Sequence, residues 1–312
     1  MTTTIHLRNQ RGDQRGDQRG RFSLGAIGDR PPASNPHLRR RLGRAFGYLG
    51  LTVVALIPLF PLYWLTISAL KTPGEFSKIP PTWFPDTPTL GPLQTALHDV
   101  PFGRSLLNSL IISGGCTIAV IITSVLAGYV FSKHHFRGRD LLFWLIVLTM
   151  FLPPIVTLVP LFTLVKTMGL DDSYLGVMLP WFANAFGIFL MRQFIADVPD
   201  ELIDAARMDG ASEWRIVWRF VFPLLRPAVV TLGVFMFVYT WNNFLWPLSI
   251  LRSDALYPVV LTLNRLMSYT MSFSYQNVVL AGALVASLPT LIIFFIAQRA
   301  FVEGIANTGI KG

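Results

Sequence analysis

Long apolar blocks without a single charged residue dominate this sequence. A block of about 18 or more such residues is typical of a helix that crosses a membrane. Backbone polar groups in lipid must be satisfied within their own segment, so each block is predicted to be helical. Only 14% of the 312 residues are charged, against about 25% in soluble domains. Six blocks meet the criterion: residues 45–70, 105–132, 141–165, 174–191, 227–251 and 277–298.

Six uncharged helices cannot all be buried inside a chain of this size, which excludes a soluble fold. We therefore predict an all-α integral membrane protein, with six transmembrane helices in one domain over residues 45–312. Residues 1–44 are rich in arginine and contain a tandem RGDQ repeat. This composition is too polar to form a core, so the segment is predicted to be a basic, disordered tail.

The basic residues are distributed unevenly between the two sides of the predicted membrane domain. If the N-terminus lies inside, the inner segments hold 20 of the 26 lysines and arginines. Cytoplasmic segments of membrane proteins carry such an excess. Both termini and the segment 192–226 are therefore predicted to be cytoplasmic, and the positive net charge indicates topology rather than nucleic-acid binding.

The sequence lacks the motifs of the common enzyme and carrier chemistries. None of the six blocks contains an acid or a base, which disfavours a carrier driven by protons or sodium. No GxxxxGK[ST] phosphate loop, HExxH, GxSxG or CxxC motif occurs, and the single cysteine, Cys116, lies within a block. We predict no catalytic residue, no metal site and no cofactor bound by this chain.

One polar stretch, residues 199–227, lies between the fourth and fifth blocks. Pro199 suits the start of a helix, Gly210 is placed to end it in a left-handed cap, and Ser212 can cap a second helix. Five acids crowd the first half: Asp200, Glu201, Asp204, Asp209 and Glu213. The second half carries one apolar stripe at helical spacing: Trp214, Val217, Trp218, Val221 and Phe222.

An amphipathic helix resting on lipid headgroups would explain the second half of this stretch. It would not explain the acids of the first half, because anionic headgroups repel them. Adjacent Ala205 and Ala206 are predicted to offer a flat surface for close approach. Acids beside small residues suit a protein groove better than a lipid surface.

The spacing of this stretch resembles a known motif. Residues 199–223 resemble the EAA loop of ATP-binding-cassette importer permeases. The matching pattern is Asp204-Ala205-Ala206, three residues, Gly210, nine residues, Phe220, one residue and Phe222-Pro223. Aspartate replaces the usual glutamate, and phenylalanines replace isoleucine and leucine. Segments 153–162, 168–180, 241–248 and 301–312 resemble the carbohydrate-uptake branch, similar to the smaller membrane subunit of the maltose transporter. The resemblance covers residues 45–312.

This resemblance implies a coupling helix between the fourth and fifth spans that docks on a cytoplasmic ATPase. The expected partners are a dimer of ATPase subunits, which binds ATP and Mg, a second homologous permease and an extracytoplasmic solute-binding protein. The expected location is the cell membrane of a prokaryote. The resemblance assigns the ATPase surface to Asp204, Ala205, Ala206, Gly210, Phe222 and Pro223. A second ATPase contact is expected at Gly309, Ile310, Lys311 and Gly312.

Aromatic rings and amides suited to a hydroxylated solute lie near the middle of the fourth and fifth blocks. The candidates for a solute path are Trp181, Asn184, Trp241, Asn242 and Asn243. The alternative is that these residues pack helices together while a companion subunit holds the solute. The substrate stays open among malto-oligosaccharides, other oligosaccharides, glycerol phosphate and a non-carbohydrate solute. The competing function is a membrane scaffold or receptor without transport.

Overall fold

The computed structural model describes residues 36–98, 101–269 and 275–308, and the regular structure in these ranges is helical throughout. The chain forms two compact units, residues 1–57 and 58–312, with the boundary inside helix α1 (Pro36–Ala69). Of the predicted tail, residues 1–35 lie outside the described ranges. Residues 36–44 are helical, so the prediction of disorder is wrong for them. Pro36 occupies the first turn, where its missing N–H costs nothing.

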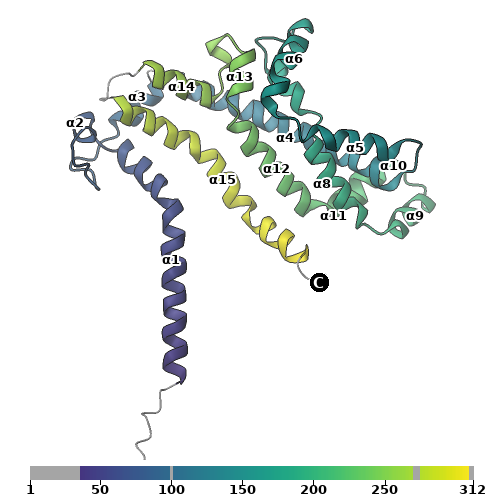
Figure 1. Ribbon diagram of the computed structural model, residues 1–312. Coiled ribbons are helices and arrows are strands. Elements are labelled where there is room, and N and C mark those ends of the chain that lie inside the picture. Colours follow the sequence, from purple (N-terminus) through teal and green to yellow (C-terminus); the bar gives the residue numbers. More distant parts are fainter. Residues whose placement is uncertain (1–35, 99–100, 270–274, 309–312) are drawn as a thin grey trace, which may run out of the picture. The chain divides into compact units, whose positions relative to one another are not determined.

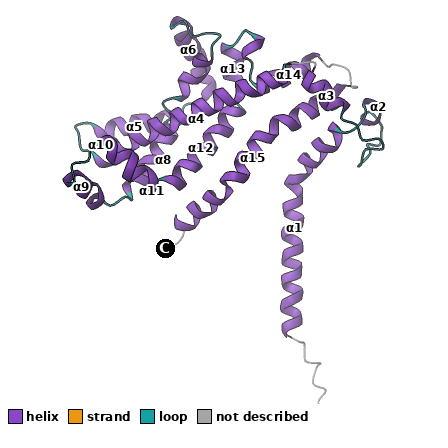
Figure 2. Ribbon diagram, turned by 180° about the vertical axis from the view of Figure 1, so that it is seen from behind, coloured by secondary structure: helices purple, strands orange, loops and turns teal. Residues whose placement is uncertain are grey.

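Three helices are individually long and apolar enough to cross a membrane: Gly47–Ala69 within α1, α4 (Phe102–Lys133) and Gln276–Gln298 within α15 (Gln276–Thr308). Figures 1 and 2 show these long helices from opposite sides. They correspond to the first, second and sixth predicted blocks. For these three, the prediction of an uninterrupted helix is confirmed.

The other three predicted blocks are interrupted. The third is two helices, α5 (Arg139–Thr149) and α6 (Pro154–Thr167), bent by 104°. The chain bends here because Pro153 and Pro154 cannot donate backbone hydrogen bonds. The fourth block contains α7 (Tyr174–Met178), η1 (Leu179–Trp181) and α8 (Ala185–Ala196), with a bend of 44°. The fifth contains α12 (Arg226–Trp241) and α13 (Leu245–Ile250).

Shorter helices form much of the remaining structure. The proline-rich segment after α1 contains α2 (Pro73–Phe76) and α3 (Gly91–His98). Further along are α9 (Asp200–Met208), α10 (Glu213–Arg215), the π-helix η2 (Ile216–Val221), α11 (Phe222–Leu224), η3 (Asp254–Leu256) and α14 (Val259–Tyr269).

Helix α4 is the centre of the second unit, and α8 and α12 pack along it (Figures 1 and 2). Small residues on α4 allow close packing. A Cβ added at Gly128 would lie 2.8 Å from Met191 Cβ and 2.9 Å from the backbone nitrogen of Arg192, both on α8. One hydrophobic cluster joins the three helices and includes Val125, Tyr129, Met191, Ile195, Leu232 and Met236.

A carboxylate clips together two turns of the second unit that are distant in the sequence. Asp172 has a positive φ of 52°, and its Oδ1 accepts hydrogen bonds from the backbone nitrogens of Arg252 and Ser253, each at 2.9 Å. Its Oδ2 accepts from the Ser253 hydroxyl. These bonds, first that hydroxyl and then the two amides, lower the pKa of Asp172. The clip fixes the turn between α6 and α7 against the turn after α13.

The lowered pKa predicts a pH-dependent contribution to stability. Because the folded pKa lies below the unfolded value of about 3.9, the contribution is complete at neutral pH and is lost as the pH falls through the folded pKa. Thermal unfolding of Asp172→Asn should therefore depend less on pH between about 2 and 5 than that of the wild type. The matched control is Asp171→Asn, whose carboxylate makes only a 3.8 Å ion pair with Arg252. Equal pH dependence of D172N and wild type would contradict the clip.

Candidate functional site

The first half of the polar stretch forms helix α9, which ends as the sequence predicts. Gly210 has a φ of +77°. Its nitrogen donates to the carbonyl of Arg207 at 3.0 Å, and the nitrogen of Ala211 donates to the carbonyl of Ala206 at 3.0 Å. This pair of bonds is typical of a helix end closed by a left-handed residue. The predicted left-handed cap at Gly210 is confirmed.

The second half begins at the predicted cap but departs from a regular helix. Ser212 Oγ accepts a hydrogen bond from the nitrogen of Arg215 at 3.4 Å. The π-helix η2 then changes the spacing of side chains from that of an α-helix. Ile216, which is not part of the predicted stripe, is buried, and Trp214 is exposed. The rings of Trp214 and Trp218 lie 5.5 Å apart and those of Trp218 and Phe222 5.2 Å apart, so the predicted alignment of these three side chains is confirmed. The segment 213–224 is bent by 84° from α12.

The two alanines of the motif do not share one surface. Ala205 is exposed, whereas Ala206 is only 3% exposed and packs in the same hydrophobic cluster as Ile203. Consecutive helical residues point about 100° apart, because a helix has 3.6 residues per turn. The prediction of a flat surface made by both alanines is therefore wrong for Ala206. Besides Ala205, the outer side of α9 presents Asp204 and Met208, the latter 83% exposed.

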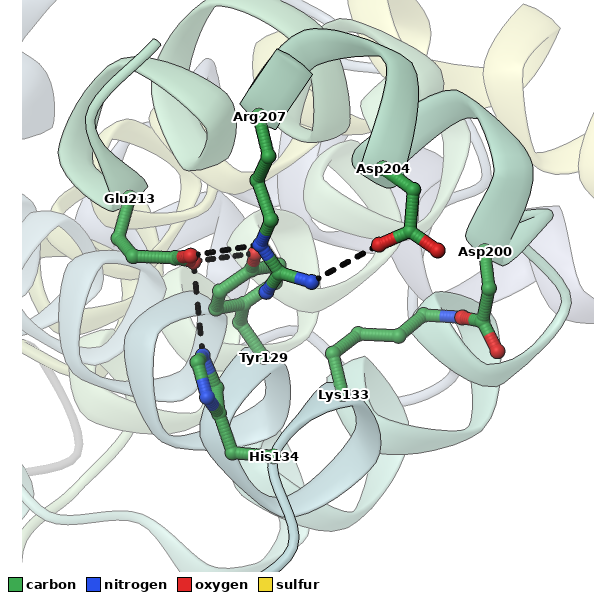
Figure 3. A network of polar contacts seen from close by, with 7 residues as sticks. All are labelled: Tyr129, Lys133, His134, Asp200, Asp204, Arg207 and Glu213. Atoms are coloured by element: carbon green, nitrogen blue, oxygen red, sulfur yellow. Dashed lines mark hydrogen bonds and ion pairs between the residues drawn. The ribbon is translucent and has the colours of Figure 1, made fainter. Parts of the chain in front are cut away.

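A polar network connects α9 to the end of α4 through Glu213 (Figure 3). Arg207 Nε lies 2.8 Å from Glu213 Oε1, and the Tyr129 hydroxyl donates to Glu213 Oε2 at 2.7 Å. His134 Nε2 is 3.5 Å from the same Oε2. Arg207 Nη1 also contacts Asp204 Oδ1 at 3.1 Å. Two carboxylates thus hold Arg207 in a fixed position on α9.

The beginning of α9 has a separate attachment to α4. The Lys133 side chain is only 7% exposed, and its Nζ lies 2.7 Å from Asp200 Oδ1. The same Nζ donates to the carbonyl of Val198 at 2.6 Å. Lys133 lowers the pKa of Asp200, and the hydrogen bond from Arg207 is the largest cause of the lowered pKa of Glu213. Both carboxylates therefore stay ionised at neutral pH, and α9 is fastened to α4 at both ends.

Sequence reasoning missed these anchoring residues as members of a site. Lys133 carries one usable signal, because it is the first charge after an uncharged block. The sequence signal at Glu213 is weaker: the residue lies off the apolar stripe. The other predicted ATPase-facing residues differ in exposure: Phe222 is half-buried against the hydrophobic cluster and Pro223 is exposed. The predicted contact at 309–312 lies outside the described residues.

A cavity of about 420 Å³ lies where the interrupted helices meet. Trp181 and Tyr239 pack edge to face, with ring centroids 5.3 Å apart. Among the described residues that line the cavity, none is charged. The lining consists of Thr149, Leu152, Pro154, Thr157, Leu158, Leu161, Pro180, Trp181, Tyr239, Asn243, Leu245 and Trp246.

Two of the five residues predicted for a solute path, Trp181 and Asn243, line this cavity. Trp241 does not: it is 2% exposed, and its Nε1 donates to the carbonyl of Ala286 at 3.1 Å. The packing alternative is therefore confirmed for Trp241.

The remaining two predicted path residues serve helix ends. Asn184 Oδ1 accepts from the nitrogen of Gly187 at 2.8 Å and caps α8. Asn242 is exposed and bonds back to the carbonyl of Val238 at 2.8 Å. Neither lines this cavity, so their predicted role in a solute path stays a prediction. Tyr239 and Trp246, which line it, were missed because the break between α12 and α13 sets their positions.

The chain combines apolar helices of membrane-spanning length with an uncharged cavity between interrupted helices. A charged helix, α9, is attached to the end of α4. These features together are those of a membrane transport protein. Residues 119–307 match the family described as "Binding-protein-dependent transport system inner membrane component". The chain belongs to this family. It is a permease subunit of an importer, as the sequence predicts, and the family is one of transport components rather than enzymes.

The relatives agree with this membership. The chain is 33% identical over 269 residues to the sn-glycerol-3-phosphate transport system permease protein UgpE of Yersinia pestis, which covers 84% of this chain and 96% of that protein. The same comparison with UgpE of Pectobacterium atrosepticum gives 35% identity over equal shares. A structure of a bacterial ABC transporter involved in the import of the acidic polysaccharide alginate matches with a TM-score of 0.75, 24% identity, and coverage of 87% of this chain and 100% of that chain.

Proposed function

We propose that this chain is one of two membrane-spanning subunits of an ABC importer that takes up a carbohydrate by alternating access. Three single helices and three bent pairs have the length and composition for up to six spans. The first helix of the third pair, 213–224, is part of the polar stretch, so in this proposal α12 and α13 form the fifth span. The excess of basic residues in 133–140 and 192–226 supports cytoplasmic ends for α4 and α8. ATP and Mg would be bound by separate ATPase subunits, and an extracytoplasmic binding protein would deliver the solute.

The observation that carries the coupling role is the double attachment of α9 to α4. Lys133 holds the start of α9, and Arg207 with Glu213 holds its end, while Ala205 and Met208 face outward. A helix held in this way moves with α4 rather than independently of it. Because α8 and α12 pack on α4, a displacement of α9 by an ATPase would reach the helices around the cavity. This is a physical route by which ATP binding elsewhere changes access to the solute.

The cavity supports an uncharged, hydroxylated substrate. The relatives are named for sn-glycerol 3-phosphate, and the related structure for the acidic polysaccharide alginate. Anionic substrates of this kind are usually held by arginine or lysine. The described lining instead offers the aromatic faces of Trp181 and Tyr239 with the amide of Asn243. Such apolar walls with a few polar groups suit a neutral sugar.

Transport by the complete importer tests this proposal. Trp181→Ala should lower the uptake of a neutral disaccharide about three- to tenfold, because it removes one aromatic wall of the cavity. The matched control is Trp83→Ala, an exposed tryptophan between α2 and α3 that does not line the cavity. Radiolabelled uptake is measured for neutral sugars and for sn-glycerol 3-phosphate. Efficient uptake of the phosphate ester alone would contradict the proposal that the substrate is neutral. Equal losses of uptake in the two variants would contradict the proposal that the solute passes through this cavity.

The competing function, a scaffold or receptor without transport, predicts a different result. Reconstituted with its partners, such a protein would accumulate no solute whatever the sugar supplied. An importer should accumulate solute only when ATP and the binding protein are both present. Family membership favours the importer.

A further inference from the structure

A second, smaller pocket shares no lining residue with the cavity. It has a volume of about 200 Å³ and lies where α4 ends, α5 begins and α8 ends. The coupling role and the solute path do not use it. Three helices contribute its lining: Phe131 and Ser132 from α4, Arg139 from α5, and Arg192, Gln193 and Ala196 from α8.

Two arginines of this pocket are held in position and only partly solvated. The Arg192 guanidinium lies 3.8 Å from the centroid of the Phe143 ring, and its Nε donates to the carbonyl of Phe131 at 3.3 Å. Arg139 Nε donates to Asp140 Oδ1 at 2.9 Å. The side chains of Arg139 and Arg192 are 19% and 24% exposed. Guanidinium groups fixed in this way lose little entropy when they bind a ligand.

The pocket carries more positive than negative charge. Asp140 is the one carboxylate paired with both arginines, at 2.9 Å from Arg139 and 3.8 Å from Arg192. Arg139 Nη1 lies 3.1 Å from His135 Nδ1, and within the described residues Arg139 Nη2 and Arg192 Nη1 make no hydrogen bond. These N–H groups, with Ser132 and Gln193 beside them, match the oxygens of a phosphate.

An apolar stripe starts next to the arginines. On α5 four exposed apolar residues recur at i, i+3, i+4 and i+7 along one side, which is the pattern of a helix face in contact with lipid. A small soluble anion would make no contact with this stripe, whereas the acyl chains of a phospholipid would pack against it. Its members are Leu141, Trp144, Leu145 and Leu148.

We propose that this pocket binds the phosphodiester of an anionic phospholipid, with Arg139 and Arg192 on the phosphate and the acyl chains along the stripe of α5. Basic pockets between helices at the cytoplasmic surface bind such headgroups. The assignment to the cytoplasmic leaflet rests on the proposed orientation; the binding itself does not. The lipid would brace the corner of α4, α5 and α8 from which α9 is held.

The test uses the full-length protein purified with its partner subunits in detergent. Thermal unfolding is followed during titration with phosphatidylglycerol, phosphatidylcholine or inorganic phosphate, and native mass spectrometry counts the retained lipids. Phosphatidylglycerol should stabilise the wild type at lower concentration than phosphatidylcholine. Its apparent affinity should fall about fivefold in Arg139→Gln or Arg192→Gln and about 25-fold in the double variant, because each change removes one basic group from the phosphate. The matched control is Arg137→Gln, in the same turn but outside the pocket.

Three results would overturn the proposal. Equal stabilisation by phosphatidylglycerol and phosphatidylcholine would show that the pocket does not recognise the charge of the lipid. An equal loss of apparent affinity in R137Q would show a general effect of surface charge rather than a site in this pocket. Stabilisation by inorganic phosphate as strong as by phosphatidylglycerol would make this a site for a soluble anion. If R192Q does not fold, R139Q still decides, because it leaves the stacking of Arg192 on the Phe143 ring in place.

Discussion

Replacing Gly210 by glutamate is expected to uncouple the importer. Gly210 has a φ of +77° and no atom within 4 Å of the position of an added Cβ. The substitution therefore meets no steric clash within the chain, but it places a charged side chain beside the surface proposed to enter the ATPase. Truncating or obstructing a central interface residue commonly costs about tenfold or more in binding. We expect copurification of the ATPase and hydrolysis stimulated by the binding protein to fall more than about tenfold.

The control for this prediction is Gly138→Glu. Gly138 also has a positive φ, +83°, and open space at its Cβ position, but it lies in the turn between α4 and α5. Both variants carry a similar backbone cost of about 1–2 kcal/mol for a left-handed residue. G138E should therefore assemble and couple nearly as the wild type does. Normal assembly and normal hydrolysis in G210E would refute the docking role of this loop.

Replacing Gly128 by alanine is expected to destabilise the contact between α4 and α8. The added Cβ would meet the backbone of α8 at 2.9 Å from the nitrogen of Arg192 and 3.0 Å from the carbonyl carbon of Met191. Backbone atoms cannot rotate away, so the two helices must separate. Overpacking of this kind costs about 1–3 kcal/mol of unfolding free energy. The measurement is the free energy of unfolding in detergent, with the yield of folded protein as a second readout.

Gly114→Ala, on the same helix, is the matched control. No atom lies within 4 Å of its Cβ position. Because alanine forms helices more readily than glycine by about 1 kcal/mol, G114A should be neutral or slightly stabilising. The two substitutions are chemically identical and differ only in what the new methyl group meets. A loss of stability in G114A as large as in G128A would show that the helix itself, rather than its packing on α8, is sensitive.

The apolar blocks could be predicted from the sequence, but the angles at which they bend could not. The apolar blocks were found from composition, because lipid admits only segments that satisfy their own backbone. Pro153 and Pro154 were visible in the third block, but the size of the bend, 104°, depends on what α5 and α6 pack against. The cavity forms at such breaks, so the side chains that line it depend on the bends. Of the lining residues, Trp181 and Asn243 were candidates from the sequence, whereas Tyr239 and Trp246 were not.

The polar stretch 199–227 shows the same limit. Local sequence signals were sufficient to predict the helical blocks, the left-handed end of α9 at Gly210 and the cap at Ser212, because each depends on neighbours a few residues away. The packing of the helices was needed to show that Ala206 faces inward and that Lys133 and Glu213 hold α9 to α4. Lys133 and Asp200 are 67 residues apart, and Tyr129 and Glu213 are 84 apart. Contacts over such separations follow from how the helices pack, which no local pattern encodes.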